Sequence, residues 1–319
     1  MINWIHEAIN NMTEFILPGL TQNPDIQKLL FIVFTLIYFL TLTGNLLIVV
    51  TITTSPLLEC PMYFFLSFFL FLTLSFIEVC PSSTMAPKMI SDLLAEKKTI
   101  SFSGCMIQVF AAHFFAGAET ILLMVMAYDC YVDICRPLHY MTTMGWWVCG
   151  LLVVLSRAGG FLHALIQVLF IVSLPFYGPN VIDHFICDLY PLLKLSCTAT
   201  HIFGFFVVAN SGLMCVLSFS ILITSYVFIL CSIRTHSSEG QWKAISTCAS
   251  HITVIILLFV PCIFEYIQPM ISFPIDKAVA VFYTLVTPML NPLIYTLRNA
   301  EVKNAMRKLW SQKMILGNN

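Results

Sequence analysis

The sequence predicts an all-α membrane protein, a bundle of seven transmembrane helices followed by a short amphipathic helix. Of the 319 residues, 59% are hydrophobic and only 10% are charged, whereas a soluble domain has about 25% charged residues. Seven apolar runs each reach the roughly 20 residues that a helix needs to cross a bilayer. They are Leu29–Thr53, Pro61–Ala86, Phe102–Ile134, Trp147–Leu174, Ile202–Ile233, Ile245–Ile267 and Ala278–Leu297.

The segments outside these runs complete the predicted domain organisation. Residues 1–28 form an N-terminal segment, residues 29–297 the seven-helix domain, and residues 298–319 a C-terminal tail. In the tail, Val302 and Met306 share one face of a helix, which predicts an amphipathic helix on the membrane surface. The N-terminal segment has no basic stretch before an apolar core, so we expect no cleavable signal peptide.

The distribution of basic residues favours an extracellular N-terminus. With this orientation, eight basic residues fall in cytoplasmic segments and six in extracellular ones, as the positive-inside rule requires. The sequon Asn11-Met12-Thr13 and the loop cysteines Cys187 and Cys197 then face an oxidising compartment. We therefore expect a glycan on Asn11 and a cytoplasmic tail.

Composition also argues against several other kinds of protein. The net charge of −1 gives no indication of a nucleic-acid partner. The twelve cysteines show no paired C-x-x-C spacing, which argues against a structural zinc site. No catalytic residues are proposed, and we expect that the protein is not an enzyme.

Several polar residues lie inside the apolar runs, where they normally face the interior of a bundle. This polar core comprises Asn45, Glu78, Glu119 and Asn291. The Asn45 amide is expected to find a partner on another helix. The two carboxyl groups can share a proton or hold a cation, and both alternatives stay open. Arg157, inside the fourth run, costs about 2.5–3.5 kcal/mol to insert unless it is paired.

Five motifs in order along the chain resemble those of the mammalian olfactory receptors, within the rhodopsin-like (class A) G-protein-coupled receptors. They are PMYFFLS from Pro61, MAYDCYVDIC from Met126, Ser225-Tyr226, KAISTCASH from Lys243 and PMLNPLIY from Pro288. The resemblance implies a multi-pass plasma-membrane receptor in contact with lipid. It also implies binding of a small, mostly neutral odorant and signalling through a stimulatory, olfactory-type G protein to cAMP.

The resemblance places an odorant cavity between the third, fifth, sixth and seventh spans. The residues expected near it are His113, Ala116, Gly117, Asn210, Ser211, Phe259, Tyr266 and Thr284. Ala112 occupies the level at which amine receptors carry an aspartate, so a cationic amine would lack its counter-ion. Such an apolar site with a few polar groups suits a small neutral molecule, although His113 could also serve only in packing.

Two cysteines are expected to close the outer side of the bundle. Cys105 begins the third run, and Cys187 lies in the polar loop from Pro175 to Thr200. A disulfide between them would hold this loop over the mouth of the bundle. Two free thiols are the alternative, which is less favoured in an oxidising space, and Cys197 has no obvious partner.

The resemblance assigns the coupling switch to the other side of the bundle. Its residues are Asp129, Cys130, Tyr131, Tyr226, Asn291, Pro292 and Tyr295. Cys130 stands where the family has an arginine that pairs with the aspartate and contacts the G protein, so Asp129 is expected to be unpaired. Pro292 removes a backbone hydrogen bond and makes the seventh helix a hinge. Class A receptors commonly hold sodium near the polar core, so a bundle sodium site is expected as one alternative.

Departures from the family pattern leave other interpretations open. The stretch from Pro61 to Glu78 holds five residues more than the pattern PMYFFLSxLSxxD/E. With Cys130 and Arg157, this extension suggests a receptor relative whose signalling is impaired. A transporter or channel is a further alternative, for which we find no internal repeat, and a non-olfactory class A receptor fits the motifs less well.

Overall fold

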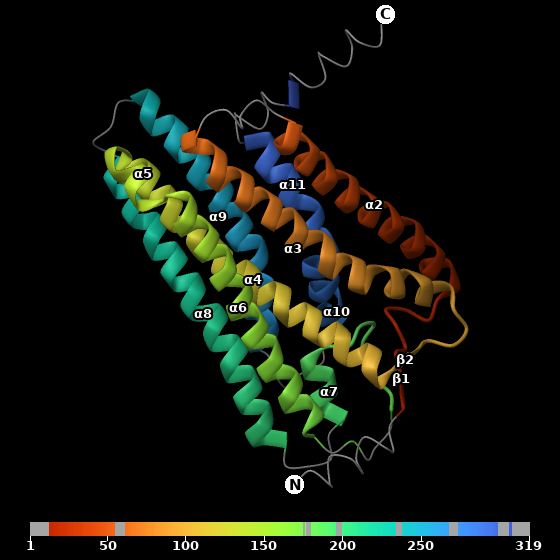
Figure 1. Cartoon of the computed structure of the whole chain (residues 1–319). Coiled ribbons are helices and arrows are strands. Elements are labelled where there is room, and N and C mark those ends of the chain that lie inside the picture. The colour runs from red at the N-terminus through yellow and green to blue at the C-terminus, as the bar shows by residue number, and fades with distance from the viewer. Residues whose placement is uncertain are drawn as a thin grey trace, which may run out of the picture.

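The computed structural model describes residues 13–54, 61–174, 176, 180–195, 200–233, 238–267, 274–298 and 306–307, which form a bundle of long helices (Figure 1). The long helices are α2 (Pro24–Thr54), α3 (Pro61–Leu94), α4 (Phe102–Cys135), α6 (Trp146–Val172), α8 (Thr200–Ile233) and α9 (Ser238–Ile267). A seventh rod consists of α10 (Pro274–Val281), the π-helical turn η3 (Phe282–Val286) and α11 (Thr287–Arg298). The shorter pieces are β1 (Glu14–Ile16), β2 (Thr99–Ser101), the 3-10 turn η2 (Pro137–His139), α5 (Tyr140–Thr143) and α7 (Leu189–Leu195).

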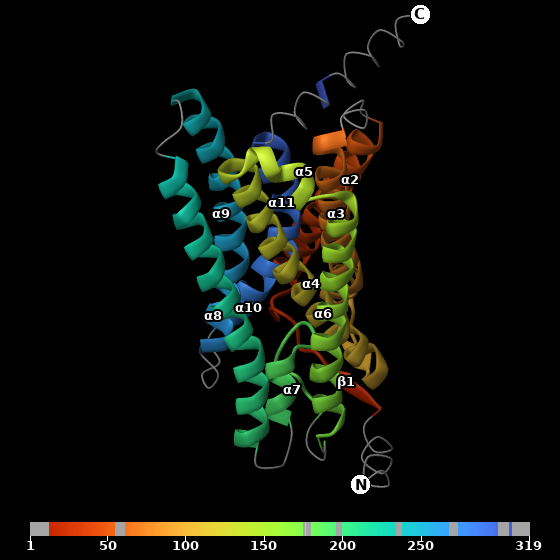
Figure 2. The same ribbon diagram turned by 60° about the vertical axis from the view of Figure 1, so that its left-hand side comes forward.

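The two ends of the bundle carry different short elements (Figures 1 and 2). At one end, called the hairpin end from here on, lie β1, β2 and α7; at the other, called the α5 end, lies α5. Strand β1 pairs antiparallel with β2, with Phe15 opposite Ile100, and Ile16 forms a parallel bridge with Val181. The all-α prediction omitted these three-residue strands, because pairing between distant segments leaves little local signal in strands so short.

The exterior of the helices is apolar, as expected for a membrane protein. Within the described residues, α2, α4, α6 and residues 209–233 of α8 are long and apolar enough to cross a membrane. Phe39, Leu46 and Phe228 are each more than 60% exposed. Soluble proteins rarely expose such contiguous apolar surface, so the chain is a multi-pass membrane protein.

Local capping explains where two of the helices begin. The side-chain oxygen of Asn23 accepts hydrogen bonds from the backbone N–H groups of Asp25 (3.0 Å) and Ile26 (3.4 Å). Asparagine is a favoured N-cap and proline a favoured first residue, so α2 begins at Pro24, earlier than the apolar run alone predicts. Ser101 caps α4 in the same way, through a bond of 3.1 Å from Gly104 N.

Two helices differ from their predicted form. Helix α3 includes Pro81 and Pro87 and continues to Leu94, beyond the predicted end of the second run near Ala86. The seventh helix departs from α geometry at η3, whereas α11 continues through Pro292. The irregular turn therefore lies before the predicted hinge. Of the predicted surface helix in the tail, only Met306 and Arg307 are described, and both are helical, so that helix stays a prediction.

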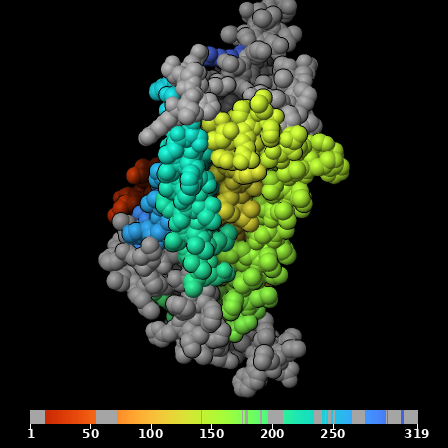
Figure 3. Space-filling model, turned by 90° about the vertical axis from the view of Figure 1, so that its left-hand side faces the viewer, coloured from red at the N-terminus to blue at the C-terminus, as the bar shows by residue number. Residues whose placement is uncertain are grey.

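Helix α4 is the central element of the bundle and packs against α3, α6, α8 and α9. Figure 3 shows it on one face between α8 and α6. The approach of α4 to α6 depends on glycine, since a Cβ atom on Gly160 would lie 2.5 Å from the Phe114 carbonyl oxygen. Small residues allow such close helix contacts in membranes. This packing brings His113 of α4 beside His163 of α6, with ring centroids 5.7 Å apart.

Candidate functional site

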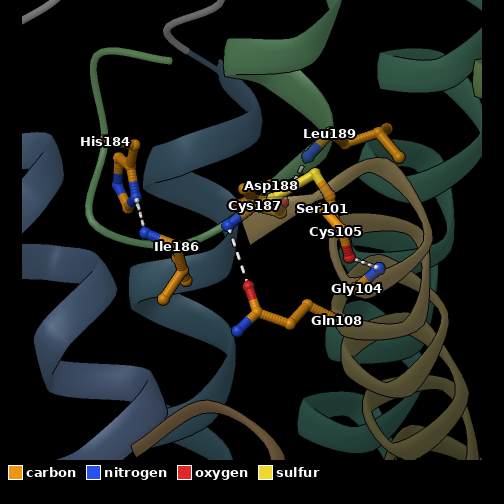
Figure 4. Close-up of a disulfide and its surroundings, with 9 residues drawn as sticks. All are labelled: Ser101, Gly104, Cys105, Gln108, His184, Ile186, Cys187, Asp188 and Leu189. Atoms are coloured by element: carbon orange, nitrogen blue, oxygen red, sulfur yellow. Dashed lines mark hydrogen bonds between the residues drawn. A yellow bond between two sulfur atoms is a disulfide. The ribbon is translucent and has the colours of Figure 1, made fainter. Parts of the chain in front are cut away.

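The hairpin end is closed by the predicted disulfide between Cys105 of α4 and Cys187 (Figure 4). The two Cα atoms are 5.3 Å apart and both residues are buried. Gln108 points from α4 toward the same loop, and its Oε1 atom accepts a hydrogen bond of 3.2 Å from Cys187 N. The loop is thus fixed to α4 by one covalent and one polar contact. Cys197 lies outside the described residues.

Further contacts tie this loop to the seventh rod. Lys277 Nζ of α10 lies 2.8 Å from Asp183 Oδ1, and it also reaches the Gly19 carbonyl oxygen at 3.4 Å. The hydrogen bond from Lys277 holds the pKa of Asp183 below its ordinary value. Next along the chain, burial lowers the pKa of His184, whose Nδ1 accepts from Ile186 N. The loop from Val181 to Asp188 therefore acts as a lid held at several points.

Beneath this lid lies a cavity of about 130 Å³, bounded by α3, α4, α6, α8, α9 and the seventh rod. Six of the eight residues predicted near an odorant line it: His113, Ala116, Gly117, Ser211, Phe259 and Thr284. Other lining residues are Ile77, Glu78, Pro81, Met85, Ala112, Phe115, Glu119, Thr120, His163, Asp188, Met214, Cys215, Leu258, Cys262, Tyr283, Thr287 and Pro288. Most of these side chains are apolar, and a few polar groups converge among them.

Two of the predicted residues do not join this lining. Asn210 is exposed on α8, because it lies about 100° around the helix from the buried Ser211; its assignment to the cavity was wrong. Tyr266 lies in α9, but its side chain is outside the described part of the chain. The prediction also missed α3 and His163, although a histidine inside an apolar run is itself a sign of an interior-facing site.

Several polar groups of the cavity already have hydrogen-bond partners within the protein. His113 Nδ1 lies 2.9 Å from the Val109 carbonyl oxygen of its own helix. Gln167 Nε2 of α6 donates a hydrogen bond of 2.8 Å to Ser211 Oγ of α8. Thr284 Oγ1 donates to the Ala280 carbonyl oxygen at 2.6 Å. These bonds orient the imidazole and the hydroxyl groups before any ligand enters.

Three members of the predicted polar core meet at the deep end of the cavity. Asn291 Nδ2 donates a hydrogen bond to Glu78 Oε1, and Glu78 also hydrogen-bonds with Glu119. A bond between two carboxyl groups requires a proton on one of them. The fourth member, Asn45, is buried but donates to the Thr41 carbonyl oxygen of its own helix at 2.9 Å. The expectation that its partner lies on another helix was therefore wrong.

Comparison with known proteins identifies the family. The family model described as "Olfactory receptor" matches residues 34–313. The chain is 56% identical to human olfactory receptor 4A47 over 97% of its length and 98% of that protein. It is 58% identical to human olfactory receptor 4B1 over 96% of its length and 97% of that protein. Mouse olfactory receptor 4B13 is 56% identical over 95% of the chain and 98% of that protein.

The chain belongs to the olfactory receptor family. Members of this family are odorant-sensing G-protein-coupled receptors and not enzymes. The cavity beneath the disulfide-linked lid is therefore the candidate odorant site of an olfactory receptor. The sequon at Asn11 lies outside the described residues.

At the α5 end lie the residues predicted to form the coupling switch, with Cys130 at the position of the expected arginine. Tyr140 of α5 donates a hydrogen bond of 2.9 Å to Asp129 Oδ1, so the expectation of an unpaired aspartate was wrong. Cys130 is buried, and its thiol is within hydrogen-bonding reach of Tyr226 on α8. Both side chains belong to one apolar cluster between α4, α8 and α9.

The other predicted switch residues are placed only in part. Tyr131 is half-buried against the same cluster. Asn291 and Pro292 are both buried in α11. A Cβ atom on Gly44 would lie 3.5 Å from Pro292 Cβ, which marks a close approach of α2 to α11. The side chain of Tyr295 is outside the described residues.

Arg157 lies at the edge of a second recess, of about 700 Å³, between α2, α3 and α6. Its guanidinium carbon is 4.9 Å from the centroid of the Phe76 ring. A cation over an aromatic face gains about 0.5–2 kcal/mol, which offsets part of the cost of placing the charge there. No acidic side chain within the described ranges forms an ion pair with Arg157.

Proposed function

We propose that this olfactory receptor binds a small, mostly neutral odorant in the cavity and signals through a stimulatory, olfactory-type G protein to cAMP. The observation that carries the proposal is the cavity of about 130 Å³ beneath the lid. An engineered apolar cavity of about 150 Å³ is large enough for benzene. Molecules with one small ring or a short chain therefore match its volume, and the apolar lining favours neutral ones.

The proposed topology has seven membrane spans, with the N-terminus and the hairpin end outside. The disulfide supports this orientation, because disulfides persist in oxidising compartments. Residues 1–28 would then carry the Asn11 glycan, and residues 298–319 would form the cytoplasmic tail with its amphipathic helix. Staining of a C-terminal epitope on intact cells would contradict this arrangement.

A signalling-impaired receptor is the second candidate function, and the switch region favours it. Cys130 is neutral and buried against Tyr226, so it offers no charge at the α5 end. A thiol on a one-carbon stem also lacks the reach of an arginine. Odorant binding at the hairpin end would then persist while G-protein activation is weak. Membership of the olfactory receptor family argues against the third alternative, a transporter or channel.

A sodium ion in the polar core stays a proposal with a defined set of residues. Glu119 Oε1 and Asn291 Oδ1 are buried without a hydrogen-bond partner, and oxygen atoms of this kind suit a hard cation. Together with Glu78, they would hold the ion, whose charge would neutralise the carboxylates. The alternative is the protonated pair, in which the proton between Glu78 and Glu119 serves this purpose.

A G-protein activation assay across an odorant panel tests the proposal. The unmodified receptor and Cys130→Arg are compared at matched surface density, with cAMP as the readout. Odorant-dependent cAMP from the unmodified chain supports the first candidate. A response only in Cys130→Arg supports the second. Silence of both variants toward a panel that demonstrably binds would contradict coupling to a stimulatory G protein.

A further inference from the structure

The hydrogen bond of His113 defines what its imidazole offers to a ligand. The Val109 carbonyl oxygen, 2.9 Å from Nδ1, can only accept. Nδ1 must therefore carry the proton, and in the neutral ring Nε2 is left as an acceptor. The residue is only 5% exposed, and Nε2 is buried without a partner. Buried polar atoms are nearly always hydrogen-bonded, so we expect this nitrogen to accept a hydrogen bond from a ligand.

Ser211 presents the complementary group to the same cavity from another helix, α8. Its hydroxyl oxygen accepts the 2.8 Å hydrogen bond from Gln167 Nε2. The hydroxyl hydrogen is not used in that bond and can be donated. Ser211 is 3% exposed and lines the same cavity as His113. The cavity therefore holds an acceptor on α4 and a donor on α8.

We propose that this cavity selects ligands that carry a hydroxyl group, small alcohols or phenols, whose hydrogen is donated to His113 Nε2. The ligand oxygen then accepts from the Ser211 hydroxyl. A ketone of the same size can accept from Ser211 but leaves Nε2 unsatisfied, and a hydrocarbon satisfies neither group. The inference rests on the proposed function, because it takes the cavity to be the odorant site.

Other polar groups of the cavity are less suited to this selection. Thr284 and Thr287 donate their hydroxyl hydrogens to the carbonyl oxygens of Ala280 and Phe282. Asp188 accepts from Leu189 N and from the Tyr283 hydroxyl. The remaining polar groups include His163, whose ring lies beside that of His113, and Glu119, whose Oε1 atom is a buried acceptor without a partner. Either could receive the same hydroxyl hydrogen, and Glu119 could also receive a cationic amine, so the test must separate both from His113.

The test uses the full-length purified receptor in lipid nanodiscs and measures binding as ligand-induced thermal stabilisation. This readout does not depend on the G protein, and therefore not on Cys130. The probes are cyclohexanol, cyclohexanone, methylcyclohexane and cyclohexylamine, which share one ring and the same number of heavy atoms. We expect cyclohexanol to bind about 10- to 100-fold more tightly than the ketone, the range for one unsatisfied buried group.

Variants assign that preference to a residue. His113→Leu should reduce the ratio of the affinity for the alcohol to the affinity for the ketone to about 2 or less, since the acceptor is gone. His113→Gln keeps an acceptor oxygen and should restore part of this affinity ratio. Ser211→Ala should weaken the binding of the alcohol and of the ketone and leave their affinity ratio unchanged, because both ligands present an acceptor oxygen. Glu119→Gln and His163→Phe should each leave the ratio unchanged. If His113→Leu does not fold, His113→Phe replaces it, and an unliganded melting curve checks each variant.

Each result has a definite meaning. Equal binding of all four probes would overturn the hydroxyl inference and leave the odorant cavity standing. Tightest binding of the amine would assign the site to Glu119 and overturn the assignment to His113. A preference that is kept in His113→Leu and lost in Glu119→Gln or His163→Phe would assign the site to that other residue, with the same consequence. Preference for the ketone would mean a doubly protonated imidazole and also overturn it. Failure of every probe to bind would count against both the inference and the proposed odorant cavity.

Discussion

The hairpin end and the α5 end of this receptor are stabilised by different kinds of contact. At the hairpin end, a disulfide, a two-stranded pairing and the ion pair of Lys277 with Asp183 join segments distant in sequence. At the α5 end, the described contacts include an apolar cluster and the hydrogen bond from Tyr140 to Asp129. Covalent and ionic links add to apolar packing at the hairpin end, whereas packing and this hydrogen bond stabilise the α5 end.

This difference has a functional consequence. A pre-formed cavity needs a fixed lid, because ordering a loop on binding would reduce affinity. A switch needs two arrangements of similar free energy, and a family member obtains one of them from an arginine beside the aspartate. Here the Tyr140 hydroxyl donates a hydrogen bond to Asp129, and Cys130 packs in the apolar cluster. We therefore expect binding and signalling to respond separately to mutation.

Breaking the disulfide should have the largest effect. Cys187→Ser should lower the free energy of unfolding by about 2–5 kcal/mol, the usual cost of losing a native disulfide. Thermal unfolding of the purified receptor measures this loss. The matched control is Cys231→Ser, since Cys231 is a free, exposed thiol on α8. Equal melting temperatures for both variants would show that the lid does not contribute to stability.

Removing the Tyr140 hydroxyl should be the next largest change, and it acts at the α5 end. Tyr140→Phe leaves the Asp129 carboxyl without its donor, at a cost of about 1–3 kcal/mol. Thermal unfolding again gives the value, and odorant affinity should be unchanged because the cavity is distant. Tyr128→Phe, at an exposed tyrosine on the same helix as Asp129, is the control. A loss of odorant affinity in Tyr140→Phe would contradict the separation of the two ends.

Restoring the family arginine should sharpen the comparison. Cys130→Arg should raise odorant-driven cAMP about 10-fold, equivalent to about 1.4 kcal/mol, because the guanidinium supplies the missing charge and reach. Odorant affinity should stay the same. Cys130→Ser, a neutral residue of similar size, should not raise cAMP. Equal responses from the unmodified receptor and Cys130→Arg at matched surface density would show that the arginine is dispensable.

Breaking the ion pair at the lid should lower the free energy of unfolding the least, by about 0.2–1 kcal/mol, because surface pairs are screened by solvent. Lys277→Met removes the hydrogen bond that lowers the pKa of Asp183 from its ordinary value of 3.8. Since the folded-state pKa is the lower one, the pair stabilises the receptor above about pH 4 and is lost as the pH falls through the lowered pKa.

The stability difference between the unmodified receptor and Lys277→Met should therefore be present at pH 7 and shrink in acid. Melting temperatures measured at pH 7 and at decreasing pH check this dependence. Lys97→Met, at an exposed lysine of the same end, serves as the control and should show no comparable trend. A difference that grows in acid would assign the effect to another group.

The helical runs could be predicted from the sequence because their signal is local, and the disulfide because both cysteines fall on one side of the predicted topology. Runs of apolar residues mark helices in lipid, where every backbone polar group must be satisfied internally. Cys105 begins the third predicted span and Cys187 lies in the long polar loop after the fourth, both on the predicted outer side, so their pairing could be anticipated. The motifs were also sufficient to identify the family, which the comparisons confirmed.

Only the tertiary structure decided which neighbours face the cavity and which partners meet. Ser211 lines it while Asn210 does not, because helix rotation is set by packing against neighbouring helices. Similarly, Asp129 bonds with Tyr140 and Asn45 bonds within its own helix, since a polar group takes the donor or acceptor that packing brings closest. The sequence determined the membrane helices and the family, through composition and motifs. Packing decided the orientation of each side chain, and with it the hydrogen-bonding groups that a ligand meets.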